Sequence, residues 1–251
     1  MILQLGLALV VVLLLPTLAF AGNEFRQSKA AVVCCSQDSL SVTAQKAVLA
    51  GSTLALSIFS DQDSVTVSSI NVSRCHNNKF MDSGVNLKGP NTPIASPTHG
   101  QMFAYYAKNT KPGPCTATVT LSGSVGVIRL ELHEITGADK TAPLDQVARN
   151  WQSAPGTETN AVTTTAKTTT TDGQYIFAAM ATISKSNPSA GSGFIGHDYD
   201  GDASMSEHQI QRVAGPIAAT FTQKSEGVFI NSVMMTFKAA DKDSLNRRKR
   251  R

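Results

Sequence analysis

Short segments of alternating apolar and polar residues recur along this chain, with turn residues between them, and this pattern most constrains its fold. It is clearest at 128–133, where Ile128, Leu130 and Leu132 share one face of a strand and polar residues take the other. No long window carries the period of an amphipathic helix, although 142–151 could form a short helical turn. Strands at roughly ten-residue spacing predict an all-β fold, an antiparallel β-sandwich of jelly-roll-like form.

Two segments add detail to this expectation. The alternation within 65–72 changes phase near Ser69, which predicts a β-bulge. The Thr-rich run 163–171 reads either as a glycosylated stalk or as a strand and turn. We favour the strand and turn, because Thr suits strands and Val162 precedes the run.

Length and composition predict one domain. Of 251 residues, 41% are apolar, and this apolar content is enough to build a core. Only 16% are charged, and this composition suits short strands with small-residue turns. We expect a β-sandwich over 46–240, preceded by an N-terminal linker or edge segment at 22–45.

The first 21 residues predict a secretory signal peptide. The start is uncharged and apolar through Phe20, Pro16 interrupts the run, and Ala19-Phe20-Ala21 is a small-x-small cleavage pattern. We therefore expect a secreted protein, extracellular or at the cell surface, with no membrane span after cleavage. The alternative is an uncleaved anchor, because about 20 apolar residues can span a bilayer.

The formal net charge of +4 is concentrated in the tail. Five of the 22 basic residues occupy 247–251, and the remaining 17 nearly balance 18 acidic residues. The body therefore has no broad basic face, and no nucleic-acid partner is expected. Residues 241–251 predict a basic disordered tail, with a processing signal or an acidic-surface anchor as the alternative.

Four cysteines, Cys34, Cys35, Cys75 and Cys115, predict disulfides in an exported protein. Adjacent cysteines seldom bond to each other, because a peptide step holds their Cα atoms too close together. We therefore expect Cys34 and Cys35 to pair with Cys75 and Cys115, in an order that stays open. A zinc site is a weaker alternative, since no C-x-x-C spacing occurs and the histidines are scattered.

The acidic stretch 197–207, HDYDGDASMSE, raises the question of calcium. A helix–loop–helix calcium loop that starts at Asp198 would need Gly at position 203 and a carboxylate at position 209, where the chain has Ala203 and Gln209. A solvated turn at Asp200-Gly201 explains the stretch simply. The alternative is a calcium site outside a helical loop, whose ligands would be Asp198, Asp200, Asp202 and Glu207.

Catalytic patterns are incomplete, so we predict no catalytic residues, no cofactor other than the calcium alternative, and no enzyme. The segment 122–126 does not fit a serine-hydrolase elbow, and 133–137 begins a zinc-protease motif without its second histidine. The carboxylates of Glu131, Glu134 and Asp198 are not placed together by the sequence, as a glycosidase would require. We expect His133, on the polar face of its strand, to be solvated. A secreted hydrolase is the less favoured interpretation.

The order of several segments resembles a family of secreted bacterial β-sandwich modules that occur in large extracellular and cell-surface proteins, mostly without assigned activity. The resemblance covers about 46–240, and the matching segments are GSTLAL (51–56), VSSI (67–70), FAYYAKNTKPGPCTATVTLSG (103–123), IRLELHEITGADKTAPLD (128–145), TTTDGQYIFAA (169–179), GSGF (191–194), EHQIQRVAGPIAATFT (207–222) and MMTFKAA (234–240). It implies a jelly-roll-like sandwich for attachment, recognition or matrix building. The cysteines and the basic tail depart from the family pattern.

The expected function is therefore non-enzymatic interaction with an extracellular protein or glycan. The alternative is a glycan-binding module that stacks sugars on exposed aromatic side chains. Its candidate platforms are Trp151 and Tyr199, although a sole tryptophan more often fills a core. Asn71-Val72-Ser73 is a sequon for N-glycosylation.

Overall fold

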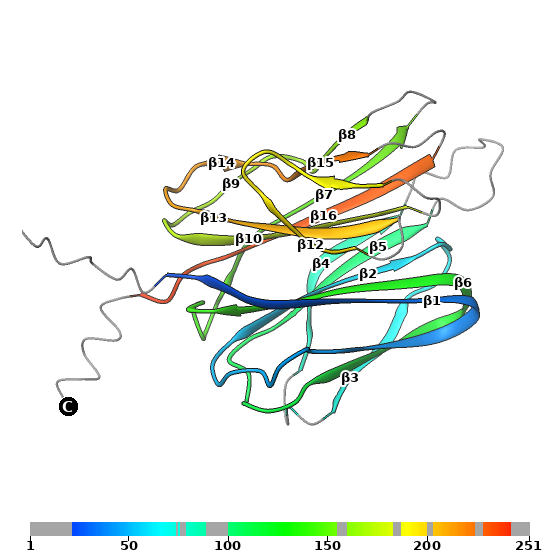
Figure 1. Cartoon of the computed structure of the whole chain (residues 1–251), viewed down its shortest axis with the longest axis horizontal. Coiled ribbons are helices and arrows are strands. Elements are labelled where there is room, and N and C mark those ends of the chain that lie inside the picture. Colours follow the sequence, from blue (N-terminus) through cyan, green and yellow to red (C-terminus); the bar gives the residue numbers. More distant parts are fainter. Residues whose placement is uncertain are drawn as a thin grey trace, which may run out of the picture.

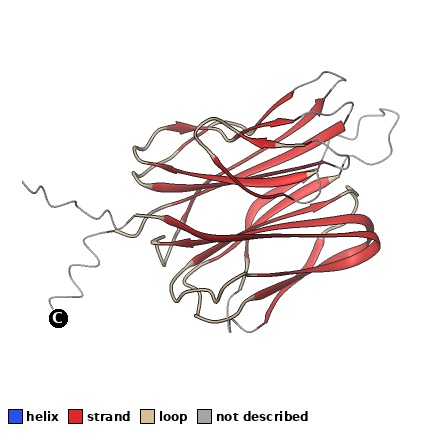
Figure 2. Cartoon of the chain, viewed as in Figure 1, coloured by secondary structure: helices blue, strands red, loops and turns tan. Residues whose placement is uncertain are grey.

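The computed structural model describes residues 22–73, 75, 79–88, 100–154, 160–182, 187–199, 203–223 and 228–241. The predicted signal peptide and residues 242–251 of the predicted tail lie outside this part. The described residues form strands and loops, and no helix among them is long and apolar enough to cross a membrane (Figure 2). The strands are β1 (Glu24–Thr43), β2 (Thr53–Ser60), β3 (Val67–Ser73), β4 (Met81–Lys88), β5 (Gln101–Ala107), β6 (Thr116–Thr136), β7 (Leu144–Ala154), β8 (Asn160–Thr163), β9 (Lys167–Thr168), β10 (Gln174–Thr182), β11 (Ser189–Ala190), β12 (Ile195–Tyr199), β13 (Ser204–Gln211), β14 (Pro216–Ile217), β15 (Thr220–Gln223) and β16 (Val228–Phe237).

The strands stack in four layers (Figure 1). The first layer contains β3 with 39–43 of β1 and 116–121 of β6, and the second contains the rest of β1 and β6 with β2, β5 and β4. The third layer is the sheet β12-β13-β10-β16-β7. The fourth consists of the sheet β11-β15-β8 and the pair β14-β9.

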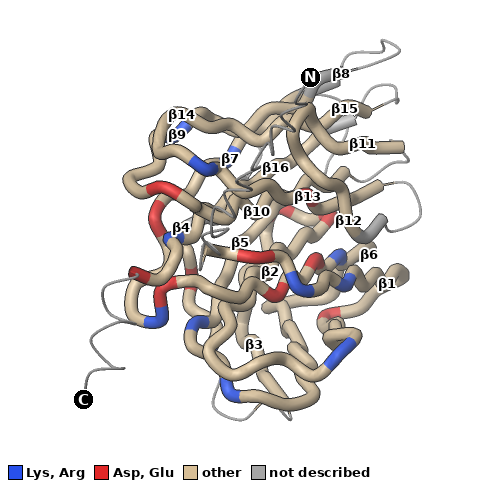
Figure 3. Tube along the Cα trace, turned by 60° about the vertical axis from the view of Figure 1, so that its left-hand side comes forward, with Lys and Arg blue, Asp and Glu red and all other residues tan. Residues whose placement is uncertain are grey.

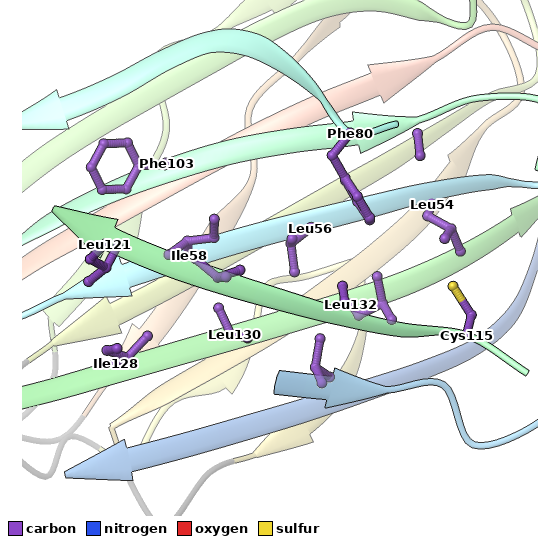
Figure 4. Close-up of a cluster of buried hydrophobic side chains, with 14 of the residues drawn as sticks. Leu54, Leu56, Ile58, Phe80, Phe103, Cys115, Leu121, Ile128, Leu130 and Leu132 are labelled. Atoms are coloured by element: carbon purple, nitrogen blue, oxygen red, sulfur yellow. The ribbon is translucent and has the colours of Figure 1, made fainter. Parts of the chain in front are cut away.

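One long ribbon joins the first two layers. Strands β1 and β6 pair antiparallel along almost their whole length, and their register shifts between Cys34 and Ser39. Cys35 and Ser36 have φ angles of 76° and 61° there, so the ribbon folds back on itself. The two arms enclose a buried apolar cluster, drawn in Figure 4, that includes Leu56, Val119 and Leu130.

The central strands are covered on both faces. All of β2 and all of β10 are buried. Alternate residues of each strand therefore serve two different clusters: Tyr175 and Phe177 pack toward the second layer, whereas Ile176 and Met180 pack toward the fourth. This double coverage sets the environment of every polar residue that points into an interlayer space.

The structure confirms the predicted all-β antiparallel sandwich. A jelly roll consists of two packed sheets, and the four stacked layers do not confirm that finer prediction. The register of β3 against β6 shifts between Val67 and Ser69, which confirms the predicted bulge. The run 163–171 holds the end of β8, the short β9 and the turns around them, as the strand-and-turn interpretation expects.

One local prediction was wrong. Residues 142–151 contain most of β7 rather than a helical turn, because β16 pairs antiparallel with this segment, with a register shift between Met235 and Phe237. Of the two alternatives for residues 22–45, the structure fits the edge segment and not the linker. These residues hold β1, an edge strand of its sheet, and β6 supplies its hydrogen-bond partners.

Candidate functional site

The outer face of the first layer carries a regular array of small polar side chains, which we call the hydroxyl face. Strand pairing aligns its residues in three rows across the sheet. The rows are Ser39–Thr120–Ser69, Ser41–Thr118–Asn71 and Thr43–Thr116–Ser73.

Strict alternation places these residues outside. Between them lie apolar neighbours such as Val42, Val119 and Ile70, which point into the cluster enclosed by the ribbon. Because successive side chains of a strand face opposite ways, burying the apolar set exposes the polar set. Side chains on the flanking strands β1 and β3 are exposed or half-buried, and those on the central strand β6 are half-buried.

The array has an approximately rectangular spacing. Neighbouring strands lie about 4.7–4.9 Å apart, and alternate residues of one strand lie about 6.7 Å apart. The hydroxyls of Ser41 and Thr118 are 2.7 Å apart, and those of Thr43 and Thr116 are 2.8 Å apart. A hydroxyl has one donor and two acceptor sites, so each pair keeps free capacity toward solvent or a ligand.

The hydroxyl face has no charge of its own. The segments 39–43, 67–73 and 116–121 contain no acidic, basic or aromatic residue, and the tube of β3 is uncoloured by charge in Figure 3. Asn71 of the predicted sequon is exposed in its middle row. The face therefore offers hydrogen bonds without electrostatic attraction or stacking.

A second polar group lies buried between the second and third layers. His133 on β6 is fully buried, with Nδ1 2.9 Å from the Tyr175 hydroxyl and Nε2 2.8 Å from Ser206 Oγ. Ser204 Oγ donates to Oε1 of Glu131 at 3.0 Å, and Ser206 Oγ lies 3.3 Å from both Oε2 of Glu131 and the carbonyl oxygen of His197. A carbonyl oxygen and a carboxylate only accept, so Ser206 donates on that side and accepts from His133 Nε2–H.

Two more histidines adjoin this group. His197 Nε2 and His208 Nδ1 are 2.6 Å apart, and the ring of Phe25 stacks over both imidazoles. Burial lowers the pKa of His208 from 6.5 to about 4, and the neighbouring His197 lowers it further. Burial also lowers the pKa of His133 well below its usual value, with His197 and His208 contributing. We call these residues, with Glu131, Tyr175 and Ser206, the histidine cluster.

The fully buried members of the histidine cluster link strands. Their bonds join β6 to β10 and β13, and His133, Ser206 and Tyr175 are all fully buried. The prediction that His133 is solvated was wrong, because the third layer covers the polar face of its strand. Glu134 is buried separately, where it accepts bonds from Arg26, Leu49 N–H and Ser52 and so holds the loop at 46–52.

The predicted calcium ligands are only partly described. Asp200 and Asp202 lie outside the described residues, and only the backbone of Asp198 is described. Glu207 is buried on the face of β13 opposite to Ser206 and His208, where its carboxyl group accepts the N–H of Gly191 at 2.9 Å. Burial raises its pKa from 4.5 to about 8, although the backbone bonds from Gly191 and Thr220 oppose that rise. Within the described residues no group of three or more His, Cys, Asp or Glu is arranged to hold a metal.

The predicted cysteine pairing was wrong. Cys75 bonds to Cys115, with Cα atoms 4.8 Å apart, whereas Cys34 and Cys35 are free and exposed. The register explains the bond, because Ser73 pairs with Thr116 and the ends of β3 and β6 bring the two cysteines together. The adjacent cysteines lie at the bend of the ribbon.

The candidate glycan platforms are not brought together. Trp151 on β7 is half-buried and packs against the cluster between the second and third layers. Tyr199 belongs to β12, at the opposite edge of the same sheet. A shallow depression of about 300 Å³ lies elsewhere, beside Leu49, Gly51 and Lys140.

Comparisons of the chain with protein-family models, curated proteins and solved structures find no match. The fold and its two polar regions therefore carry the functional argument. Sequence reasoning did not single out the hydroxyl face, although the alternation within 39–43, 69–73 and 116–120 was a usable signal.

Proposed function

We propose that this chain is an exported attachment module that binds the surface of an uncharged, packed polysaccharide through its hydroxyl face. The observation that carries the proposal is the alignment of nine small polar residues in three uncharged rows. This function combines the expected role in extracellular attachment with the glycan-binding alternative. It needs neither a cleft nor an aromatic platform.

The chemistry favours a repeating partner over a single sugar. An exposed neutral hydrogen bond contributes only about 0.5–1.5 kcal/mol, because it replaces bonds to water. A single saccharide would contact too few rows to bind firmly. A packed polysaccharide presents hydroxyls at regular intervals over a wide area, so many weak bonds form together at little further entropic cost.

Other groups of the structure support a binding role through their positions. The carboxylates of Glu131 and Glu134, and the imidazole of His133, are buried and bonded to neighbouring strands. Sequence reasoning weighed these side chains for catalysis together with Asp198, whose side chain lies outside the described residues. Their contacts suit a structural role, which supports assigning binding to the exposed hydroxyl face.

A depletion assay with insoluble polysaccharides tests the proposal. The protein is mixed with cellulose, chitin or an uncharged β-glucan and sedimented, and unbound protein is measured. We expect binding to at least one, and at least a tenfold loss with Thr118→Lys, which places a long charged side chain at the centre of the face. Thr222→Lys is the matched control, because Thr222 is an exposed strand residue of the fourth layer that pairs with the Ser189 hydroxyl.

Two outcomes would contradict the proposal. One is equal binding by Thr118→Lys and the wild type. The other is failure of the wild type to bind any polysaccharide of the panel.

A further inference from the structure

The adjacent cysteines Cys34 and Cys35 form a site that the proposed function does not use. They lie at the bend of the β1–β6 ribbon, where the register against β6 is interrupted between Cys34 and Gln37. Both side chains are exposed. The buried bond between Cys75 and Cys115 leaves them as the chain's two remaining thiols.

The backbone departs from regular strand geometry at these two thiols. Cys35 and Ser36 both adopt left-handed φ angles, 76° and 61°, which non-glycine residues rarely do in succession. In a regular strand the side chains of consecutive residues face opposite ways, and the left-handed φ of Cys35 breaks that alternation. One trans peptide unit joins the two residues, so their Cα atoms lie about 3.8 Å apart. The neighbouring Cys34 side chain raises the pKa of Cys35.

We propose that Cys34 and Cys35 are a redox-labile dithiol that closes into a disulfide between adjacent residues when a low-molecular-weight disulfide is present. One thiolate attacks the small disulfide, which forms a mixed disulfide and releases one small thiolate. The other cysteine then loses its proton and attacks the protein sulfur of the mixed disulfide, so the second small thiolate leaves. The oxidant is reduced to two small thiols, and one S–S bond replaces the two protein S–H bonds.

Geometry predicts that this bond is more easily reduced than the Cys75–Cys115 bond. Neighbouring Cα atoms lie about 3.8 Å apart across a trans peptide, which is below the usual span of a disulfide. Strained and exposed disulfides have higher reduction potentials than relaxed, buried ones. The Cys75–Cys115 bond is buried, and its Cα separation of 4.8 Å lies within the usual range.

The test follows both cysteine pairs in the full chain across glutathione buffers of increasing oxidising strength. Free thiols are alkylated after equilibration and tryptic peptides are weighed. The peptide 30–46, between Lys29 and Lys46, contains Cys34 and Cys35 and no other cysteine. In monomeric protein we expect this peptide to lose both alkyl groups and to weigh two hydrogens less than the unalkylated dithiol, in buffers more oxidising than those that already form the Cys75–Cys115 bond. Cys34→Ser and Cys35→Ser are matched controls, because each leaves one thiol that forms only a mixed disulfide or a dimer.

Three outcomes would overturn the proposal. The wild type could give only mixed disulfides or covalent dimers at 30–46. Cys34 or Cys35 could be found bonded to Cys75 or Cys115. The bond between the adjacent cysteines could form and reduce in the same buffers as the Cys75–Cys115 bond.

Discussion

The hydroxyl face and the histidine cluster are both built from polar residues that alternate with apolar ones along β6, yet they have opposite environments. Thr116, Thr118 and Thr120 near the start of β6 face outward, and none of the described strands forms a layer over them. Glu131 and His133 near its end meet the third layer and are almost fully buried. The comparison teaches that alternation tells which residues share a face, whereas burial depends on whether another layer covers that face.

The largest expected effect concerns the histidine cluster. His133→Ala would leave the Tyr175 hydroxyl and Ser206 Oγ without their imidazole partner and would open a cavity between layers. We expect it to lower the free energy of unfolding by about 3–5 kcal/mol, measured by urea denaturation. His133→Gln keeps a side chain able to form hydrogen bonds, so it should lower the free energy of unfolding by less than His133→Ala does. A loss below about 1 kcal/mol for the alanine variant would mean that the cluster does not join the layers.

The next effect concerns Glu207 and its dependence on pH. Its folded pKa of about 8 lies above its ordinary value of 4.5, so the folded state holds the proton more tightly than the unfolded state does. The resulting stability is present below pH 4.5 and is lost as the pH rises toward 8. Glu207→Gln should therefore be more stable than the wild type by about 2–4 kcal/mol at pH 8, and by much less at pH 5. Thermal melts at both pH values measure this, and a gain that does not change with pH would contradict it.

A smaller effect of opposite sign concerns His208. Its folded pKa of about 4 lies below 6.5, so its neutral form stabilises the fold above pH 6.5 and this stability is lost as the pH falls toward 4. Buried His133 has the same sign, and Glu207 opposes both. In a Glu207→Gln background we expect the free energy of unfolding to fall by roughly 2 kcal/mol between pH 7 and pH 4.5. Adding His208→Gln should reduce that loss, and an equal loss in both backgrounds would exclude His208 as its source.

The smallest effect belongs to the hydroxyl face. Thr118→Ala removes one of two paired exposed hydroxyls and buries no unsatisfied group. We expect the free energy of unfolding to change by less than about 0.5 kcal/mol, in contrast to His133→Ala. A change above about 2 kcal/mol would show that the face serves stability, and the comparison between the two regions would fail.

Local patterns could be read from the sequence, whereas the covering of one layer by another could not. The alternation at Ile128–His133 and the bulge near Ser69 follow from neighbouring residues alone, and the structure confirms both. The burial of His133 depends on β10 and β13, which lie at least 40 residues later in the chain. A polar residue on one strand face looks the same in sequence whether water or another sheet lies opposite.

The cysteine pairing also depends on contacts between distant strands that the sequence could not reveal. This pairing follows from the register of Ser73 against Thr116 and from the bend at Cys35, and neither feature has a strong local signature. The expectation that adjacent cysteines avoid each other therefore led to the wrong pairs. Trp151 is half-buried against a core cluster, which fits the core role that the sequence weighed against a glycan platform.

The most direct test of the central claim removes hydroxyls from the face without changing its shape. The variant Thr116→Val, Thr118→Val, Thr120→Val replaces the central strand's hydroxyls with methyl groups of similar size, and valine suits strands. Its partition onto the polysaccharide that binds the wild type is measured together with its melting temperature. We predict at least a tenfold weaker partition with a melting temperature no lower than that of the wild type. Unchanged binding by this folded variant would contradict the claim that the hydroxyl face makes the contact.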